Sequence, residues 1–184
     1  MDTCLDQFQL IFKALQFAAE KHTGQRRKNI ERSPYINHPI AVAFYLSTFG
    51  GINDHRILTA AILHDTLEDT DTTEEELEKN FGLEILNLVK EVTDDKKLSK
   101  ELRKQLQIVH ARGISAGAKN IKLADKISNI TDIMNAPPAL WTYKRKTEYL
   151  NWTERVVKEL SGTNGALEKL YFDRLSEARS SLRL

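Results

Sequence analysis

The sequence has few cysteines for disulfides or metal sites, and no long apolar segment for membrane insertion. Cys4 is the only cysteine among 184 residues, which excludes an internal disulfide and any zinc site built from several thiolates. No apolar run approaches the roughly 20 residues that a transmembrane helix needs. The opening MDTCLDQFQL carries two aspartates and does not resemble a secretory signal. We therefore expect a cytoplasmic protein with no membrane partner.

The sequence also has little net charge. Its 27 basic and 26 acidic residues give a formal charge of +1, so the whole molecule has no positive field that would hold a nucleic acid. Basic residues gather at 26–28 and 96–104, but acids are interleaved with them. This pattern favours a local phosphate pocket over a nucleic-acid surface. It carries no prediction of oligomeric state.

The apolar pattern predicts an all-α fold. Runs of β-branched residues are few, no repeat period is visible, and 184 residues suit one core. We expect a single-domain helical bundle over residues 1–184, with its core at about 5–175. Spacings of three and four predict helices over the first twenty or so residues, from His38 to Gly50, and over 57–63, 73–81, 83–92, 116–134, about 141–160 and from 163 onward.

Local signals support several of these helix ends. Pro39 fits a first helical turn, where its missing N–H is not needed. Thr72 or Thr73, followed three residues later by glutamate, is typical of a capping box. Pro137 and Pro138 should end the long helix before them. The charged segment 93–105 is either a solvated helix start or part of a site.

The segment ILHDTLED, residues 62–69, is where chemistry is expected. From Ile57 to Leu63 six of seven residues are apolar, which predicts a buried helix, and His64, Asp65, Glu68 and Asp69 follow directly. If the helix persists, all four polar side chains flank the same end of it. Burying them without compensation is costly, so a cation is expected among them. The alternative is a helix that has surfaced, with solvated acids.

Two further ligand-type residues accompany this segment. His38 stands beside Pro39, and Asp125 lies within KLADKISN. Taken singly, His38 is a helix-start hydrogen bonder and Asp125 an exposed acid. Together with His64 and Asp65 they form a set of two imidazoles and two carboxylates, which suits Mn²⁺, Fe²⁺ or Zn²⁺ better than Ca²⁺. Such a metal activates water and polarises a phosphoryl oxygen, so the set indicates a phosphohydrolase.

Four blocks in this order carry a family resemblance: HPIAVAFYL, ILHDTLEDT, EVTDDKK and KLADKISNI. The chain resembles the HD-domain hydrolases of guanosine tetraphosphate (ppGpp) in the RelA/SpoT group, and most of all their small stand-alone homologues in animals. The likeness extends from FAAEKH at residue 17 to LEKL at residue 167. It implies an all-helical HD fold with one Mn²⁺ per chain, and release of pyrophosphate from the 3′ position of ppGpp.

The matched motif positions imply roles for individual residues. The implied metal ligands are His38, His64, Asp65 and Asp125. Glu68 and Asp69 match an acidic pair that positions and activates the attacking water. The implied nucleotide-binding residues are Arg27, Lys28, Lys100, Asn129, Arg145 and Tyr149. On pattern alone, Tyr149 could equally be a packed aromatic residue beside Trp152.

One position departs from the family pattern. The family motif continues from the asparagine to an arginine two residues later, where this chain has Thr131. We expect this change to affect fine specificity more than hydrolysis. No alarmone-synthesising or regulatory domain is recognisable, so hydrolysis alone is expected. Two alternatives stay open: a phosphatase acting on another nucleotide, such as the 2′-phosphate of NADPH, and a non-catalytic nucleotide-binding module.

Overall fold

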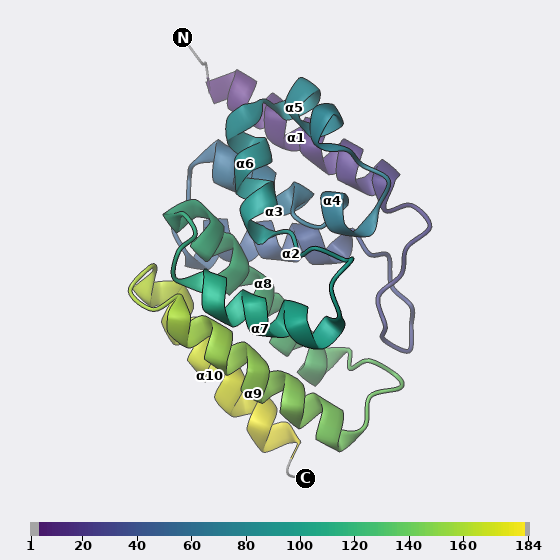
Figure 1. Ribbon diagram of the computed structural model, residues 1–184, viewed down its shortest axis with the longest axis vertical. Helices are drawn as coiled ribbons and strands as arrows, with labels where there is room; N and C mark the ends of the chain where they lie inside the picture. Colours follow the sequence, from purple (N-terminus) through teal and green to yellow (C-terminus); the bar gives the residue numbers. More distant parts are fainter. Residues whose placement is uncertain (1–3, 183–184) are drawn as a thin grey trace.

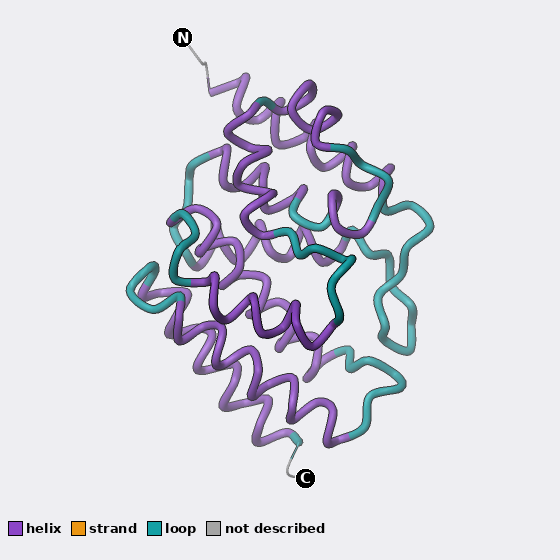
Figure 2. Tube along the Cα trace, viewed as in Figure 1, coloured by secondary structure: helices purple, strands orange, loops and turns teal. Residues whose placement is uncertain are grey.

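The computed structural model describes residues 4–182, and Figures 1 and 2 show helices joined by loops throughout this part of the chain. The elements are α1 (Cys4–Lys21), α2 (Asn37–Phe44), the π-helix η1 (Tyr45–Phe49), α3 (His55–Leu63), α4 (Thr66–Asp69), α5 (Glu74–Phe81), α6 (Leu83–Val92), α7 (Lys100–Ala111), α8 (Ala116–Asn135), α9 (Tyr143–Glu159) and α10 (Gly165–Ser181). The predicted all-α fold is confirmed.

The local signals for helix ends act as expected. Thr73 caps α5 by accepting a hydrogen bond from the Glu76 backbone N–H at 3.2 Å. Gly82 ends the same helix with a φ of 83°, a conformation that glycine adopts without strain. The double proline at 137–138 follows the end of α8 at Asn135. These ends are encoded by residues adjacent in sequence.

The π-helix was not predicted from the sequence, and the structure also decides whether the buried helix predicted over 57–63 persists beyond Leu63. The helix that begins at Asn37 changes at Tyr45 into five residues of π-helix before Gly50 ends it. The buried helix α3 does not persist into the acidic segment. It ends at Leu63, whose carbonyl accepts a 2.7 Å hydrogen bond from the Thr66 hydroxyl, and a separate short helix α4 follows. His64 and Asp65 lie between the two helices, with backbone angles still in the right-handed helical region.

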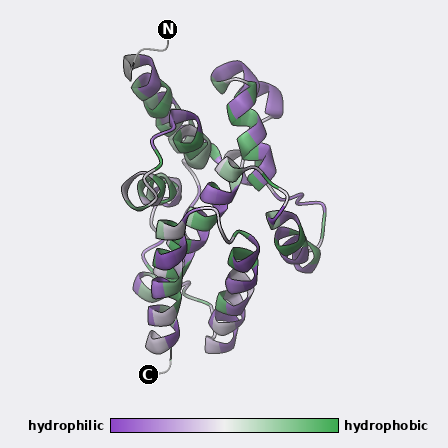
Figure 3. Cartoon of the chain, turned by 90° about the vertical axis from the view of Figure 1, so that its left-hand side faces the viewer, coloured by the Kyte–Doolittle hydropathy of each residue, from purple (hydrophilic) through white to green (hydrophobic). Residues whose placement is uncertain are grey.

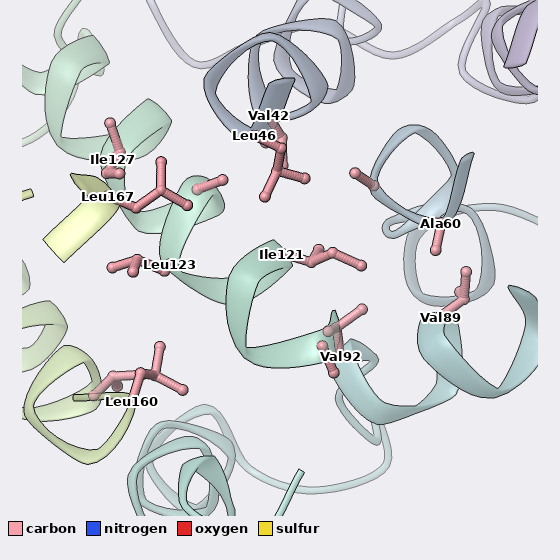
Figure 4. Close-up of a cluster of buried hydrophobic side chains, with 14 of the residues drawn as sticks. Val42, Leu46, Ala60, Val89, Val92, Ile121, Leu123, Ile127, Leu160 and Leu167 are labelled. Atoms are coloured by element: carbon pink, nitrogen blue, oxygen red, sulfur yellow. The ribbon is translucent and has the colours of Figure 1, made fainter. Parts of the chain in front are cut away.

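Helix α8 forms the centre of the molecule. It packs against α2, α3, α6, α9, α10 and η1. Figure 4 shows Ile121 of α8 among side chains of α2, η1, α3 and α6, while Leu123 and Ile127 lie toward Leu160 and Leu167. Ile121, Leu123 and Ile127 are fully buried, and burying each contributes about 1.5–3 kcal/mol. This packing fixes the position of α8 and therefore of its polar residues.

The outer helices are amphipathic, and Figure 3 shows green apolar segments alternating with purple polar ones along them. Helices α9 and α10 lie side by side at the carboxyl-terminal end (Figure 1). Loops 22–36, 93–99 and 136–142 all lie on the side of the molecule drawn at the right in Figure 1. None of the helices within residues 4–182 combines the length and apolar character needed to cross a membrane.

Candidate active site

The end of α3 places two ligand-type side chains in the interior. His64 is 6% exposed, and its Nδ1 donates a 2.8 Å hydrogen bond to the Ala61 carbonyl. This bond requires the proton on Nδ1, so in the neutral ring Nε2 carries the lone pair. Asp65 directs Oδ2 to within 3.1 Å of that Nε2. Two adjacent residues after the end of α3 therefore place an imidazole and a carboxylate together.

Side chains from α2 and α8 meet this pair. One ligand atom each from His38, His64 and Asp65 lies within 4.8 Å of the others, a spacing that could hold a metal ion. His38 Nε2 also lies 3.1 Å from Asp125 Oδ1. The structure thus brings together all four residues that the sequence suggested as metal ligands. Their role as ligands stays a prediction.

A surrounding layer of partners fixes these side chains. His38 Nδ1 is hydrogen bonded to the buried Ser128 hydroxyl at 3.0 Å, which turns Nε2 toward the carboxylates. Lys126 Nζ lies 2.8 Å from Asp125 Oδ2, and Asn129 Nδ2 donates to Asp125 Oδ1 at 2.5 Å. Such partners orient metal-binding side chains and select their protonation state.

The chemistry of this donor set fits a divalent cation. His64 Nε2 is buried and has no hydrogen-bond partner within residues 4–182, although a carboxylate oxygen is close. Burial opposes a charge on the ring, but the Asp65 carboxylate outweighs it and raises the pKa of His64 to about 9. The site attracts positive charge at Nε2, and a metal ion could replace that proton.

The acidic pair on α4 lies next to the ligand set. Glu68 Oε2 accepts a 3.1 Å hydrogen bond from the Asp94 backbone N–H, and Oε1 accepts from Arg103 Nη1 at 3.3 Å. Asp69 Oδ2 accepts from the Tyr35 hydroxyl at 3.3 Å, and Oδ1 forms an ion pair with Lys96. Both acids are therefore held by residues from other segments.

The two acids differ in their surroundings. Burial raises the pKa of Glu68 to about 7, with a further contribution from the carboxylate of Asp94, and the hydrogen bond from the Asp94 backbone offsets only part of the rise. A carboxyl group with a pKa near neutrality is suited to accepting and releasing protons at physiological pH. Of the two acids, Glu68 is accordingly the better candidate for a general base.

A pocket of about 1200 Å³ opens over this region. Its lining includes His38, Glu68 and Asp69, whereas His64, Asp65 and Asp125 do not line it. Those three side chains contact His38 or one another beneath the lining. The lining cations are Arg26, Arg27, Lys28, Lys100, Arg103, Lys104, Lys144 and Arg145. A pocket with this lining suits a ligand with several phosphate groups.

All six residues that the family motifs matched to nucleotide binding line the pocket. Arg27 donates to Asn129 Oδ1 at 3.0 Å and to Asp132 Oδ2 at 2.6 Å. Asn129 therefore links Arg27 to Asp125 and the ligand set. Lys28 is exposed, and its backbone carbonyl accepts a 2.8 Å hydrogen bond from Ala139. This bond ties the basic loop to the 136–142 loop.

The pocket lining also contains Lys100, Arg145 and Tyr149. The Arg145 guanidinium lies 4.6 Å from the Trp141 ring centre, and the Trp141 ring lies 5.3 Å from that of Tyr149. The ring of Tyr149 in turn lies 5.4 Å from that of Trp152. Tyr149 thus lines the pocket and also packs against other aromatic rings. Its two expected roles, nucleotide binding and aromatic packing, are compatible.

Several residues of the site escaped the sequence analysis. Tyr35 donates a 2.6 Å hydrogen bond to Asp65 Oδ2, and Ser128, Lys126 and Trp141 contact predicted site residues. Ser128 stands three residues after Asp125, on the same face of α8, and that spacing was a usable signal. Tyr35 lies in a loop, where no periodicity indicates which way a side chain points.

The segment 93–105 was expected to be either the start of a solvated helix or part of a site, and it is both. Helix α7 begins at Lys100 after the Ser99 cap, and Lys100, Arg103 and Lys104 line the pocket. Thr131, the departure from the family pattern, is not among the lining residues. Its hydroxyl accepts a 3.4 Å hydrogen bond from Tyr45 in η1. This position therefore contacts the π-helix and does not line the pocket.

The sequence matches the profile of the HD domain over residues 14–150. A similar protein of Xenopus tropicalis, named guanosine-3′,5′-bis(diphosphate) 3′-pyrophosphohydrolase MESH1, is 54% identical over 159 residues, which cover 86% of this chain and 89% of that protein. The human protein of the same name is 52% identical with the same coverage. The chain belongs to the HD-domain family and, within it, to the group of animal MESH1 proteins.

Solved structures give the same relationship. A structure described as a metazoan ortholog of SpoT that hydrolyses ppGpp superposes with a TM-score of 0.89 at 43% identity, covering 96% of this chain and 97% of that one. A second structure, from Listeria monocytogenes, has a TM-score of 0.66 at 26% identity, covering 82% of this chain and 97% of that one. The family fold expected from the motifs is thereby confirmed.

Proposed function

We propose that this protein hydrolyses guanosine 3′,5′-bis(diphosphate) to GDP and pyrophosphate. The observation that carries the proposal is the convergence of His38, His64 and Asp65 beside an acidic pair, at a pocket whose walls present eight cations. Relatives that share about half of this sequence are named for this reaction. Cationic walls suit a substrate with two diphosphate groups.

We assign metal binding to His38, His64, Asp65 and Asp125. Two imidazoles with two carboxylates suit Mn²⁺, with Zn²⁺ or Fe²⁺ as alternatives. When bound, the metal would supply Lewis acidity, which activates water and polarises a phosphoryl oxygen. The protein contributes orientation, because the proton on His38 Nδ1 can be donated to the Ser128 hydroxyl and leaves Nε2 free to coordinate.

Glu68 and Asp69 are assigned to the attacking water. Glu68, with its pKa near 7, removes a proton as the water oxygen attacks the phosphorus attached to the 3′ oxygen. The bond between that phosphorus and the 3′ oxygen breaks, the water oxygen becomes part of pyrophosphate, and the 3′ oxygen takes up a proton. Asp69, held by Tyr35 and Lys96, keeps the water in line with the leaving oxygen.

The remaining pocket residues are assigned to the nucleotide. These are Arg27, Lys28, Lys100, Asn129, Arg145 and Tyr149. Arg145 can pair with two phosphate oxygens at once, whereas Lys28 and Lys100 act as point charges. Arg27 is engaged by Asn129 and Asp132, so it contributes a fixed planar surface at the edge of the ligand set.

Product analysis tests the proposal. The purified protein is incubated with Mn²⁺ and either ppGpp or NADPH, and the released anions are identified. Pyrophosphate together with GDP is the expected result from ppGpp. Orthophosphate from NADPH with no turnover of ppGpp would make the protein a nucleotide phosphatase. Binding of nucleotide without any product would make it a non-catalytic binding module.

A further inference from the structure

Both carboxylate oxygens of Glu68 already accept a hydrogen bond. Oε2 accepts from the backbone N–H of Asp94, and Oε1 accepts from the Arg103 guanidinium. A cation at hydrogen-bond distance stabilises the ionised carboxylate and makes it a weaker base. Moving Arg103 away from Oε1 would therefore make Glu68 a stronger base toward water.

Arg103 is only loosely held in this position. Its contact with Glu68 is 3.3 Å long, beyond the usual range for N–H···O hydrogen bonds. Its Nε is buried and has no hydrogen-bond partner among the residues that the structure describes. A guanidinium has five N–H donors in a planar fork. The side chain therefore has donors to offer to a ligand with several acceptor oxygens.

The position of Arg103 gives it access to such a ligand. It lines the pocket from α7, together with Lys100 and Lys104 on the same wall. Lys104 lies 4.8 Å from the centre of the Trp152 ring, which fixes that ammonium group. Arg103 differs from both lysines because it pairs with Glu68 as well as facing the pocket. Arg103 therefore links the cationic wall of the pocket to Glu68.

We propose that Arg103 is a further catalytic residue, whose guanidinium leaves Glu68 to bind a phosphate oxygen of the substrate. The inference rests on the hydrolase function proposed above. The exchange frees Glu68 Oε1 to receive the proton of the attacking water, while the guanidinium stabilises negative charge on the departing pyrophosphate. Arginine suits this exchange because its fork can bind two oxygens of one phosphate. Substrate binding and activation of the base are thereby coupled.

The test compares Arg103→Gln and Arg103→Lys with the wild type in the Mn²⁺-loaded enzyme. We expect Arg103→Gln to lower kcat for ppGpp about 10²-fold, as for loss of a charge-stabilising donor. Arg103→Lys keeps the point charge and should recover about tenfold of that loss. Arg112→Gln is the matched control, because Arg112 lies at the end of α7 and pairs with Glu159 on the surface.

The pH profile separates this role from a purely structural one. The charged groups near Glu68 are the acids Asp65, Asp69 and Asp94 and the cations Arg103 and Lys122. Removing the Arg103 cation destabilises the ionised form of Glu68, so the acid limb of kcat/KM should move to higher pH. A change that only loosened the fold would lower the melting temperature and leave this limb in place.

Inorganic pyrophosphate gives a measurement that does not depend on turnover. We expect its binding, measured by calorimetry, to weaken about tenfold or more in Arg103→Gln and to stay unchanged in Arg112→Gln. An active wild type with unchanged kcat, pH limb and pyrophosphate binding in Arg103→Gln would overturn the inference. If Arg103→Gln does not fold, kcat, the acid limb and pyrophosphate binding are compared between Arg103→Lys and the wild type instead, and unchanged values again overturn the inference. A wild type that does not cleave ppGpp counts against the proposed function instead, and pyrophosphate binding still tests Arg103.

Discussion

His38 Nε2 lies 3.1 Å from a carboxylate oxygen of Asp125, although the two residues belong to α2 and α8. Helix α8 packs against α2, so two buried faces with no local relationship in sequence bring these polar groups together. An imidazole and a carboxylate at this distance are costly to bury unless a proton or a metal ion lies between them.

Changing Asp65 to Ala should abolish metal-dependent turnover. The substitution removes the carboxylate that lies close to both His38 and His64. We expect metal content, measured by atomic absorption after dialysis, to fall from about one ion per chain to near zero. Asp71→Ala is the control, because Asp71 is 88% exposed at a surface ion pair. Full activity in Asp65→Ala would remove this residue from the ligand set.

Changing Glu68 to Gln should lower kcat about 10²-fold or more while metal stays bound. The wild-type rate should also fall about tenfold per pH unit below about 7, because Glu68 has a pKa of about 7 and must be ionised to accept a proton. Steady-state rates between pH 5 and 9 check both points. Loss of metal together with activity in Glu68→Gln would show that this residue is a ligand.

Glu68 should also influence stability in the metal-free protein. Its pKa is raised from 4.5 to about 7 on folding, so the folded state binds the proton more tightly than the unfolded state. The ionised form therefore destabilises the fold above pH 7, and this cost disappears as the pH falls toward 4.5. We expect Glu68→Gln to raise the free energy of unfolding at pH 8 by about 1–3 kcal/mol.

Urea denaturation at pH 8 and pH 5 measures this effect, with Glu78→Gln as the control at an exposed position. The difference between Glu68→Gln and wild type should shrink at the lower pH. An equal difference at both pH values would mean that the substitution acts through packing. In that case the raised pKa of Glu68 makes no contribution to stability.

Ser128→Ala should weaken metal binding without removing any ligand. The serine hydroxyl holds Nδ1 of His38, and its loss lets the ring rotate away from the cluster. Loss of such a partner typically lowers metal affinity 10- to 100-fold. Titration of the metal-free protein with Mn²⁺ gives the affinity, and thermal melting checks the fold. Unchanged affinity would show that the packing of α2 and α8 alone orients the ring.

Local sequence determined most of the secondary structure. Periodic apolar residues, a capping threonine and paired prolines act on their own neighbours, so the helices and many of their ends could be predicted. His64 and Asp65 could also be recognised as candidate ligands from local sequence, because they directly follow a helix predicted to be buried. The end of α3 at Leu63 matches the end of the apolar run over 57–63, but the hydrogen bond from the Thr66 hydroxyl to the Leu63 carbonyl, which competes with helix continuation, was not predicted.

Only the tertiary structure decided which of these residues meet. Tyr35 reaches Asp65 from a loop, and Lys126 pairs with Asp125 inside the core. Arg103 pairs with Glu68 because α7 packs along α9 and its start lies over the pocket. Sequence periodicity specifies which face of a helix is buried, but not which other helix covers that face. The partners of each acid therefore follow from packing over long sequence separations.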